Sequence, residues 1–380
     1  MLLVLMVLFT ACSGVSIGLF GESAPPRPQA QVSILPGDQA TDISPTLPVS
    51  VQVTGGALQQ VALTNPDGKA VAGTLSADRH SWTSAEPLGY GKTYTWSGTA
   101  AGPDQLPVPV TGSFTTVTPQ RQLRATLNIG DTDTVGIAAP IILQFEDHVS
   151  DKAAVERALQ VQTSVPTEGS WAWLPDDNGR SRAHYRTKDY WQSGTKVSIA
   201  AKLYGVAYGG GDYGKEDIST QFTIGRAQIV KADVNSHRMI VIRDGQEVMN
   251  FPASYGLGSD PNRHTTNGIH VVMNKSQKVL MTSRRYGYFN IPMYWAVRVS
   301  NNGEFIHANP ESTGAQGSAN VTHGCINLST ANARQYFDTA IFGDPVEVTN
   351  SPTPLTAADG DIYDWTVSWE DWRAMSALHS

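Results

Sequence analysis

The chain has 380 residues, a formal net charge of −7 and two cysteines. Its length predicts two or three domains of about 150 residues each. It contains no run of Lys or Arg, which excludes the basic stripe typical of nucleic-acid binding, and its cysteines and histidines lack the paired spacings of a zinc site. We therefore expect no nucleic-acid partner, no metal and no cofactor.

The N-terminus carries signals of export. Residues 2–11 are apolar and lead directly into Cys12, a pattern similar to the site at which bacterial lipoproteins are cleaved and lipidated. No Lys or Arg precedes Arg27, so the usual basic segment is missing, and an uncleaved membrane anchor is the alternative. Residues 22–30 are rich in proline and predict an extended tether. Residues 1–30 are thus expected to hold an exported protein at the outer face of the plasma membrane.

Residues 31–117 and 118–226 each show short alternating apolar runs separated by turn residues, the pattern of a β-sandwich. Both stretches close in the same way, at Phe114-Thr115 and Phe222-Thr223, which favours two tandem immunoglobulin-like domains. A short helix or turn is predicted at 151–159. Four tryptophans are expected in the cores: Trp82, Trp96, Trp171 and Trp173. A rigid spacer is the favoured role of the sandwiches, and ligand binding is the alternative.

A third region begins near Gln228. Apolar runs at 239–242 and 248–251 flank the dipeptide Asp244-Gly245, which predicts a β-hairpin. The glycine-rich stretch at 255–258 lacks the strand-to-helix context of a dinucleotide-binding loop. A nucleotide cofactor is therefore not expected.

Cys325 is the only cysteine beyond the N-terminal segment, and His323 stands two residues before it. An imidazole can take the proton of a thiol, which leaves sulfur as a nucleophile. On an extended segment the two side chains would project from one face, and Gly324 between them would expose backbone N–H groups that can stabilise an oxyanion. The alternative is an inert, buried cysteine. Polar neighbours, Thr322 and Asn327, favour the nucleophile.

The residues around this pair resemble a known signature. His307, fourteen intervening residues and then Thr322-His323-Gly324-Cys325-Ile326-Asn327 are similar to the signature of L,D-transpeptidases with the YkuD catalytic domain. Together with the C-terminal tail, the chain is most similar to the mycobacterial members. The resemblance implies a mostly β fold, with two tandem immunoglobulin-like β-sandwiches, a β-rich catalytic domain at 227–350 and an extension at 351–380 that ends in a short helix.

The resemblance also implies an activity. Cys325 would attack a peptidoglycan tetrapeptide stem at the third residue, release D-alanine and pass the acyl group to the side-chain amine of a neighbouring stem, which forms a 3→3 diaminopimelate cross-link. His323 would be the base, and carbapenems would acylate the same sulfur. An L,D-carboxypeptidase, which transfers the acyl group to water, and a non-catalytic wall-binding lipoprotein are the alternatives.

Further roles follow from the same resemblance. His307 is expected to line the pocket, with a satisfied core histidine as its alternative, and the carbonyl of Ala308 is expected to orient His323. Asn327 is expected to hold substrate or brace the loop. Thr322 is expected to fix the turn through its hydroxyl rather than to contact substrate.

Residues 280–299 are implied to be a mobile flap over the cysteine. Tyr286 and Tyr294 are predicted to line the acyl-donor pocket, because Gly287 and Pro292 should interrupt any regular core element. Packing or surface positions without a catalytic role are predicted for Met293, Trp295, His264 and His270.

The tail has its own pattern. Ser368 and Asp371 form a capping box at the start of a helix. Trp365, Trp369 and Trp372 are spaced to lie on one side of it. By resemblance, the tail packs back on the protein and fixes the catalytic domain against the second sandwich.

Overall fold

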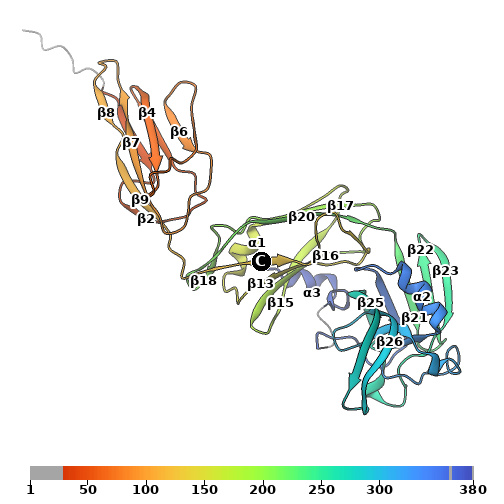
Figure 1. Cartoon of the computed structure of the whole chain (residues 1–380). Helices are drawn as coiled ribbons and strands as arrows, with labels where there is room; N and C mark the ends of the chain where they lie inside the picture. The colour runs from red at the N-terminus through yellow and green to blue at the C-terminus, as the bar shows by residue number, and fades with distance from the viewer. Residues whose placement is uncertain (1–28, 359–361, 379–380) are drawn as a thin grey trace, which may run out of the picture. The chain divides into compact units, whose positions relative to one another are not determined.

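The computed structural model describes residues 29–358 and 362–378. The predicted anchor and Cys12 lie outside these residues. The chain divides into two compact units, Met1–Thr118 and Pro119–Ser380 (Figure 1). Within the described residues, no helix combines the length and the apolar character needed to cross a membrane.

The first unit is a β-sandwich. Its strands are β1 Gln31–Leu35, β2 Ala40–Ile43, β3 Ser50–Thr54, β4 Ala57–Thr64, β5 Gly73–Leu75, β6 Ser81–Ser84, β7 Thr93–Ala101, β8 Pro107–Pro109 and β9 Gly112–Thr116. One sheet has the order β1-β3-β6-β5, and the other has the order β2-β9-β7-β4 with β8 paired to β7. Val51 and Val53 alternate inward from β3. Trp82 and Trp96 are buried as predicted and meet edge to face at 5.3 Å.

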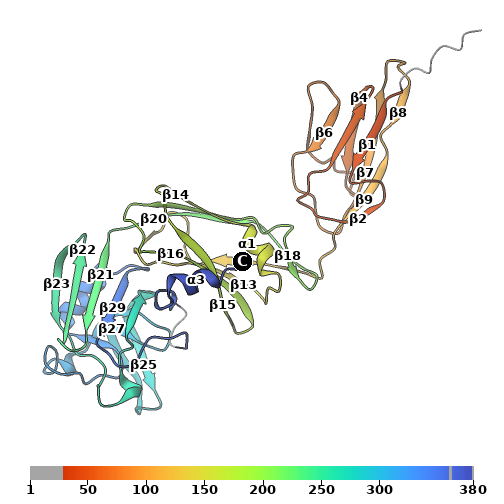
Figure 2. The ribbon, with the colours of Figure 1, turned by 180° about the vertical axis from the view of Figure 1, so that it is seen from behind.

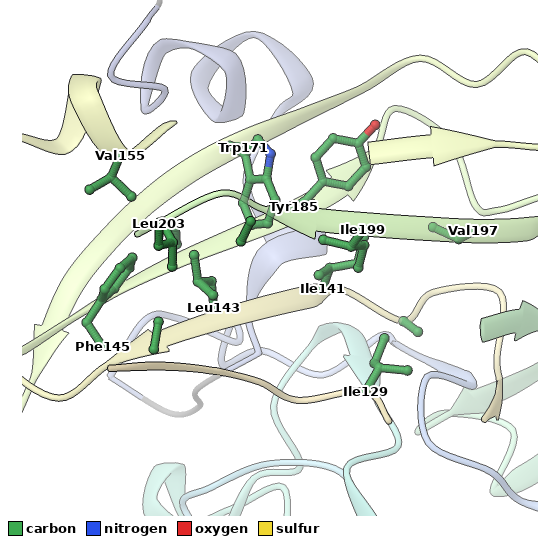
Figure 3. Close-up of a cluster of buried hydrophobic side chains, with 14 of the residues drawn as sticks. Ile129, Ile141, Leu143, Phe145, Val155, Trp171, Tyr185, Val197, Ile199 and Leu203 are labelled. Atoms are coloured by element: carbon green, nitrogen blue, oxygen red, sulfur yellow. The ribbon is translucent and has the colours of Figure 1, made fainter. Parts of the chain in front are cut away.

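The second unit begins with another sandwich. Its elements are β10 Arg121–Leu123, β11 Ala125–Leu127, β12 Thr134–Val135, β13 Ile141–Phe145, α1 Lys152–Arg157, β14 Leu159–Thr163, β15 Gly169–Asp177, β16 Arg180–Thr187, β17 Lys196–Ala201, β18 Ala207–Gly209, β19 Asp212–Gly214 and β20 Ile218–Ile224. Two four-stranded sheets, β11-β13-β16-β15 and β12-β20-β17-β14, enclose the core, beside a small β10-β19-β18 sheet. Figure 3 shows Ile141 of β13 beside Ile199 of β17, and Leu143 beside Leu203 in the same buried cluster. Trp171 and Trp173 are buried, as predicted.

Two further sheets follow in the same unit (Figure 2). Their elements are β21 Gln228–Asp233, β22 Arg238–Arg243, β23 Gln246–Pro252, the 3-10 helix η1 Pro261–Arg263, β24 Gly268–Val271, β25 Asn274–Ser283, β26 Tyr288–Arg298, β27 Phe305–Ala308, the 3-10 helix η2 Pro310–Ser312, β28 Ile326–Leu328, α2 Thr330–Thr339 and β29 Pro345–Thr349. The sheets have the orders β23-β22-β21-β29-β24 and β25-β26-β27-β28. Asp244 and Gly245, at φ 49° and 80°, form the predicted hairpin turn. Tyr336 of α2 is fully buried in the core that the sheets share.

The second sandwich and this C-terminal region are joined by buried polar contacts. Arg226 donates from Nη1 and Nη2 to the Asp344 carboxylate, at 2.9 and 2.6 Å. Burial raises the pKa of Asp344, and Arg226 opposes that shift. Gly136 lies against the turn at Gly343, where a Cβ on residue 136 would stand 2.3 Å from the Asp344 nitrogen. Only glycine fits this approach, because a Cβ on residue 136 would clash with the backbone of the turn.

The tail closes over the second sandwich. It contains the 3-10 helix η3 Asp364–Thr366 and the helix α3 Trp369–Ala374, which lies beside β15 (Figures 1 and 2). The capping box is confirmed, because Ser368 Oγ accepts from the Asp371 N–H at 3.1 Å. Trp369 and Trp372 lie on α3, but Trp365 lies in η3 before that helix begins, so the prediction that all three share one side of the helix is wrong. The three rings instead gather around the guanidinium of Arg186. Ring centroids lie 4.9, 5.3 and 4.9 Å from its Cζ for Trp365, Trp369 and Trp372.

Candidate functional site

Two cavities meet at Cys325. The first, of about 340 Å³, has a largely apolar wall and is called the apolar cavity below; it is lined by Met281, Tyr288, Ile291, Met293, His307, Asn309, Glu311, Ser312, Val321, Thr322, His323, Cys325 and Asn327. The second, of about 500 Å³, is called the polar cavity. Its walls hold Asn262, His264, Arg298, Asn302 and Glu304 beside flap residues. His323 and Cys325 line both cavities.

The segment that carries the pair is a bend, so the prediction of an extended backbone is wrong. Gly324 has φ 112°, a conformation that favours glycine. Thr322 holds the bend, as predicted: its Oγ1 donates to the Cys325 carbonyl at 2.7 Å and accepts from the Gly324 N–H at 3.3 Å. Thr265 Oγ1 donates to the Gly324 carbonyl at 2.8 Å. The bend is therefore fixed by side-chain hydrogen bonds, and both reactive side chains still line the same cavities.

The thiol of Cys325 is a neutral hydrogen-bond donor in this arrangement. Its Sγ lies 3.6 Å from the carbonyl oxygen of Gly303, in the turn between β26 and β27. The residue as a whole keeps some exposed surface, but burial of the thiol raises its pKa to about 12. A hydrogen bond from the Phe305 N–H lowers the pKa, and the charge of Glu304 raises it further. Such a thiol needs a base when it attacks.

His323 is exposed and stands beside the flap. Its ring centroid lies 4.4 Å from that of Tyr286 and 5.7 Å from that of Tyr288. Desolvation, with help from Arg263, lowers the pKa of His323, while Asp260 raises it. The imidazole is thus neutral at pH 7 and able to accept a proton.

His307 is buried at 2% exposure and lines the apolar cavity. Its Nδ1 lies 2.9 Å from the carbonyl of Ala308, so Nδ1 carries the proton and Nε2 the lone pair. Burial lowers the pKa of His307 to about 4, which keeps the ring neutral. The Ala308 carbonyl therefore holds His307, rather than His323 as expected. Both interpretations of His307 apply: it is a satisfied buried histidine and a wall of the pocket.

Asn327 lies in β28, opposite His307 in the parallel β27–β28 pair. Its main chain exchanges hydrogen bonds with Ser254, N–H to O at 2.9 Å and O to N–H at 3.1 Å. Within the described residues, Asn327 Oδ1 is buried without a hydrogen-bond partner, and the residue lines the apolar cavity. The side chain is thus available to the pocket while the backbone braces the strand.

The flap is a β-hairpin with a register shift between Met281 and Ser283. The turn at Gly287 interrupts it as predicted, but Pro292 lies within β26, so that part of the prediction is wrong. Gly287, at φ 70°, closes the tip, and Pro292 pairs with Leu280 inside the hairpin. Proline is tolerated there because β27 pairs with β26 only from Tyr294 onward, which leaves one edge of β26 free at Pro292.

The two flap tyrosines differ in position. Tyr286 donates from its hydroxyl to the Asn262 carbonyl at 3.0 Å and lines the polar cavity. Tyr294 is 47% exposed, with Lys278 6.0 Å from its ring, and it is not among the residues that line either cavity.

Several residues at the site were not predicted from the sequence. Tyr288 lines both cavities, and its pKa is raised by burial and by Cys325. Met293, predicted as packing, lines the apolar cavity. Glu304 is buried beside Gly324, and a carboxylate directly before the apolar strand at Phe305 was the available signal.

His264 and His270, the two histidines predicted to have no catalytic role, make structural contacts. His264 Nδ1 lies 2.7 Å from Thr353 Oγ1, although the residue also lines the polar cavity. His270 is fully buried and its Nε2 lies 2.8 Å from the Thr266 carbonyl. Among the described residues, no group of three or more His, Cys, Asp or Glu side chains is placed to hold a metal ion.

Comparison with known families gives two matches. Residues 227–348 match the L,D-transpeptidase catalytic domain, YkuD. Residues 40–207 match the bacterial Ig domain. The catalytic match contains both cavities, and the Ig match lies in the sandwich region.

Similar proteins agree with these matches. L,D-transpeptidase 5 of Mycobacterium tuberculosis is 53% identical over 368 residues, which cover 97% of this chain and 81% of the relative. L,D-transpeptidase 2 of Mycobacterium tuberculosis is 35% identical, over 90% of this chain and 83% of the relative. The solved structure of the LD transpeptidase LdtMt1 in complex with imipenem is 32% identical and covers 61% of this chain and 99% of its own, with a TM-score of 0.51.

Proposed function

The chain belongs to the L,D-transpeptidase family and is an acyltransferase of that type, and from this premise we propose that it cross-links peptidoglycan through Cys325. The Cys325 sulfur attacks the carbonyl of the third residue of a tetrapeptide stem, and His323 accepts the thiol proton. The bond to D-alanine breaks as the proton passes to the leaving amine, which leaves a thioester. The side-chain amine of diaminopimelate on a second stem then attacks the thioester, and the 3→3 cross-link forms as the thiol is restored.

One observation carries this proposal: His323 and Cys325 line both cavities. Transpeptidation needs an acyl donor and an amine acceptor at the same sulfur. Two cavities that meet at Cys325 give each partner its own approach. The neutral His323 lines the same two cavities as the thiol, and we assign to it the transfer of the proton from the thiol and later from the amine.

The surrounding residues have supporting roles. Of the backbone N–H groups at the bend, that of Gly324 donates to Thr322 Oγ1, so the N–H of Cys325 is the one assigned to a developing oxyanion. His307 and Asn327 form the wall of the apolar cavity, each with a side-chain polar atom free for substrate. The rings of Tyr286 and Tyr288 lie 4.4 and 5.7 Å from the His323 ring, and their proposed role is to position it.

The test is incubation with a disaccharide-tetrapeptide, with products read by mass spectrometry. The native protein is expected to form a dimer that lacks one D-alanine, and Cys325→Ala is expected to form none. Dimer formation by Cys325→Ala would contradict the role of the nucleophile. Release of D-alanine without dimer would instead identify an L,D-carboxypeptidase. The absence of both dimer and released D-alanine would favour a non-catalytic wall-binding protein.

Carbapenems are proposed as covalent inhibitors. The similar LD transpeptidase LdtMt1 has been solved in complex with imipenem. We expect one imipenem adduct on Cys325 of the folded native protein by intact mass, and none on Cys325→Ala. A native protein without an adduct would contradict this assignment.

Export and attachment to the membrane through residues 1–30 are part of the proposal, with Cys12 as the lipidated residue. A family that acts on peptidoglycan needs its catalytic site outside the plasma membrane. Cys12→Ala is expected to move the protein from the membrane fraction to the soluble exported fraction.

The sandwiches are proposed to serve as spacers, since their aromatic residues are core residues.

A further inference from the structure

The turn between β26 and β27 surrounds the Cys325 sulfur. Gly303 O accepts from the thiol at 3.6 Å. The charge of Glu304 also raises the pKa of the thiol, whereas the N–H of Phe305 donates to the sulfur and lowers it. Gly303 has φ 104°, which turns its carbonyl into the site at little cost for a glycine. The thiol proton is therefore directed toward a main-chain carbonyl of this turn in the resting enzyme.

Glu304 is fixed in the same turn. It is 5% exposed, and both carboxylate oxygens act as acceptors: Oε1 from the Thr266 N–H at 2.7 Å and Oε2 from the Thr266 hydroxyl at 2.8 Å. His270 Nδ1 stands 3.8 Å from Oε2. Oε1 also lies 3.9 Å from the position that a Cβ on Gly324 would occupy. A carboxylate is thus held beside the catalytic bend, with little freedom to turn away.

The bend and the carboxylate share one support. Thr265 Oγ1 holds the Gly324 carbonyl, and Thr266 holds Glu304. Gly256 N–H donates to the same Thr265 Oγ1 at 3.0 Å. Because adjacent residues hold both groups, the distance between the carboxylate and the nucleophile is set by the fold rather than by a flexible side chain.

We propose that Gly303 and Glu304 act as a guard that keeps the resting Cys325 thiol protonated, with Glu304 as a positioning residue. This inference rests on the proposed role of Cys325 as the nucleophile. A carbonyl acceptor and a negative charge both favour the neutral thiol. The sulfur then becomes nucleophilic only when a bound acyl donor draws it from Gly303 toward His323. Small electrophiles that do not fill the cavities are therefore poor reagents for this cysteine.

Other titratable or charged groups also line the cavities at the sulfur: Tyr286 and Tyr288 of the flap, Arg298 of β26, His307 of β27, Glu311 of η2, and His264 and His323 of the loops. Glu311 is exposed, so solvent screens its charge more than that of Glu304. His307 is neutral. Glu304 is therefore the buried carboxylate whose removal should change the state of the thiol.

The test is the pH dependence of Cys325 alkylation by iodoacetamide in the full chain, followed by peptide mass spectrometry that resolves Cys325 from Cys12. Glu304→Gln keeps the shape and removes the charge. Its alkylation midpoint is expected about one pH unit below that of the native protein, which corresponds to about tenfold faster alkylation at pH 7.5. Glu304→Asp keeps the charge and is expected to stay near the native midpoint. The matched control is Glu247→Gln, at an exposed carboxylate on β23, with no expected change.

An unchanged midpoint in folded Glu304→Gln would overturn the proposal. A structural effect alone would change the plateau rate at high pH rather than the midpoint. The native protein gives a second test that needs no variant: its midpoint is expected above the ordinary thiol value of about 8.5, and a midpoint at or below that value would overturn the guard. Alkylation measures the thiol without transpeptidation. An unchanged alkylation midpoint together with intact dimer formation would therefore contradict the role of Gly303 and Glu304 alone. Loss of dimer formation would contradict the proposed transpeptidase function.

Discussion

Histidines have opposite environments in two regions of the molecule. The first region is the tail interface, where residues 362–378 pack on the second sandwich, and the second is the catalytic rim, formed by His323 and the flap tyrosines Tyr286 and Tyr288. In the interface, His184 lies 3.0 Å from Asp364, with side-chain exposures of 1% and 0%. At the rim, His323 is exposed between two flap tyrosines and carries a lowered pKa. The first histidine is fixed by a buried carboxyl partner, whereas the second is exposed and can exchange a proton.

Within one compact unit, the tail interface is therefore expected to contribute mainly to folding stability, and the flap region mainly to catalysis. The interface buries Trp372 completely, and its Nε1 donates to the Ser170 carbonyl at 3.0 Å. The flap instead leaves apolar side chains in solvent, with Phe289 59% and Leu280 56% exposed. Substitutions in the interface should therefore affect folding, and substitutions at the rim should affect catalysis.

The largest effect is expected from Trp372→Ala. Removing a fully buried indole leaves a cavity and an unpaired carbonyl at Ser170, which should lower the free energy of unfolding by about 3–5 kcal/mol. Urea unfolding of the native and variant chains measures this change. Trp369→Ala is the matched control: this indole is only half-buried, so a clearly smaller loss is expected. Equal losses would mean that the tail is not held by the buried ring.

His323→Gln tests the opposite region. Loss of the base should slow acylation by imipenem about 10²–10³-fold. The thermal unfolding temperature should stay unchanged, because the residue is exposed. His264→Gln removes a histidine from the polar cavity wall and is expected to change the rate less than threefold. A comparable loss in both variants would assign the proton transfer to a different group.

His307 lies between these two behaviours, because it is buried and also lines the pocket. Its folded pKa of about 4 is below the ordinary value of 6.5. The stability that it contributes is thus fully present above pH 6.5 and is lost as the pH falls toward 4. The loss amounts to roughly 3 kcal/mol. Urea unfolding at pH 7.5 and pH 4.5 should show this difference in the native chain. His307→Gln should lose most of it, and an equally steep pH dependence in that variant would contradict the prediction.

Local sequence signals predicted the regular parts of the fold. The turn at Asp244-Gly245, the capping box at Ser368 and the buried tryptophans depend on contacts within a few residues or on periodic burial. Such patterns are visible in a single sequence because the physics is local. The mostly β architecture followed from them and from the resemblance of the signature residues.

The site was less predictable because long-range contacts shape it. The bend at Gly324 depends on Thr265, far away in the sequence, and the thiol contact depends on Gly303. Pro292 misled the flap prediction, since an unpaired strand edge cannot be seen before the sheet order is known. The Ala308 carbonyl had two possible histidine partners, and only the local geometry selects His307.

The smallest effect separates two flap tyrosines that the sequence ranked in the wrong order, because it placed Tyr294 rather than Tyr288 at the pocket. Tyr288 lines both cavities beside His323, whereas Tyr294 faces solvent near Lys278. Tyr288→Ala is expected to slow acylation by imipenem about tenfold, because the ring that limits the motion of His323 is lost. Tyr294→Ala, its matched control on the same strand, is expected to stay within about twofold of the native rate. Stopped-flow measurement of the acylation rate compares them. A larger loss for Tyr294→Ala would show that the hairpin changes its pairing when substrate binds, and the catalytic rim would then extend along the whole of β26.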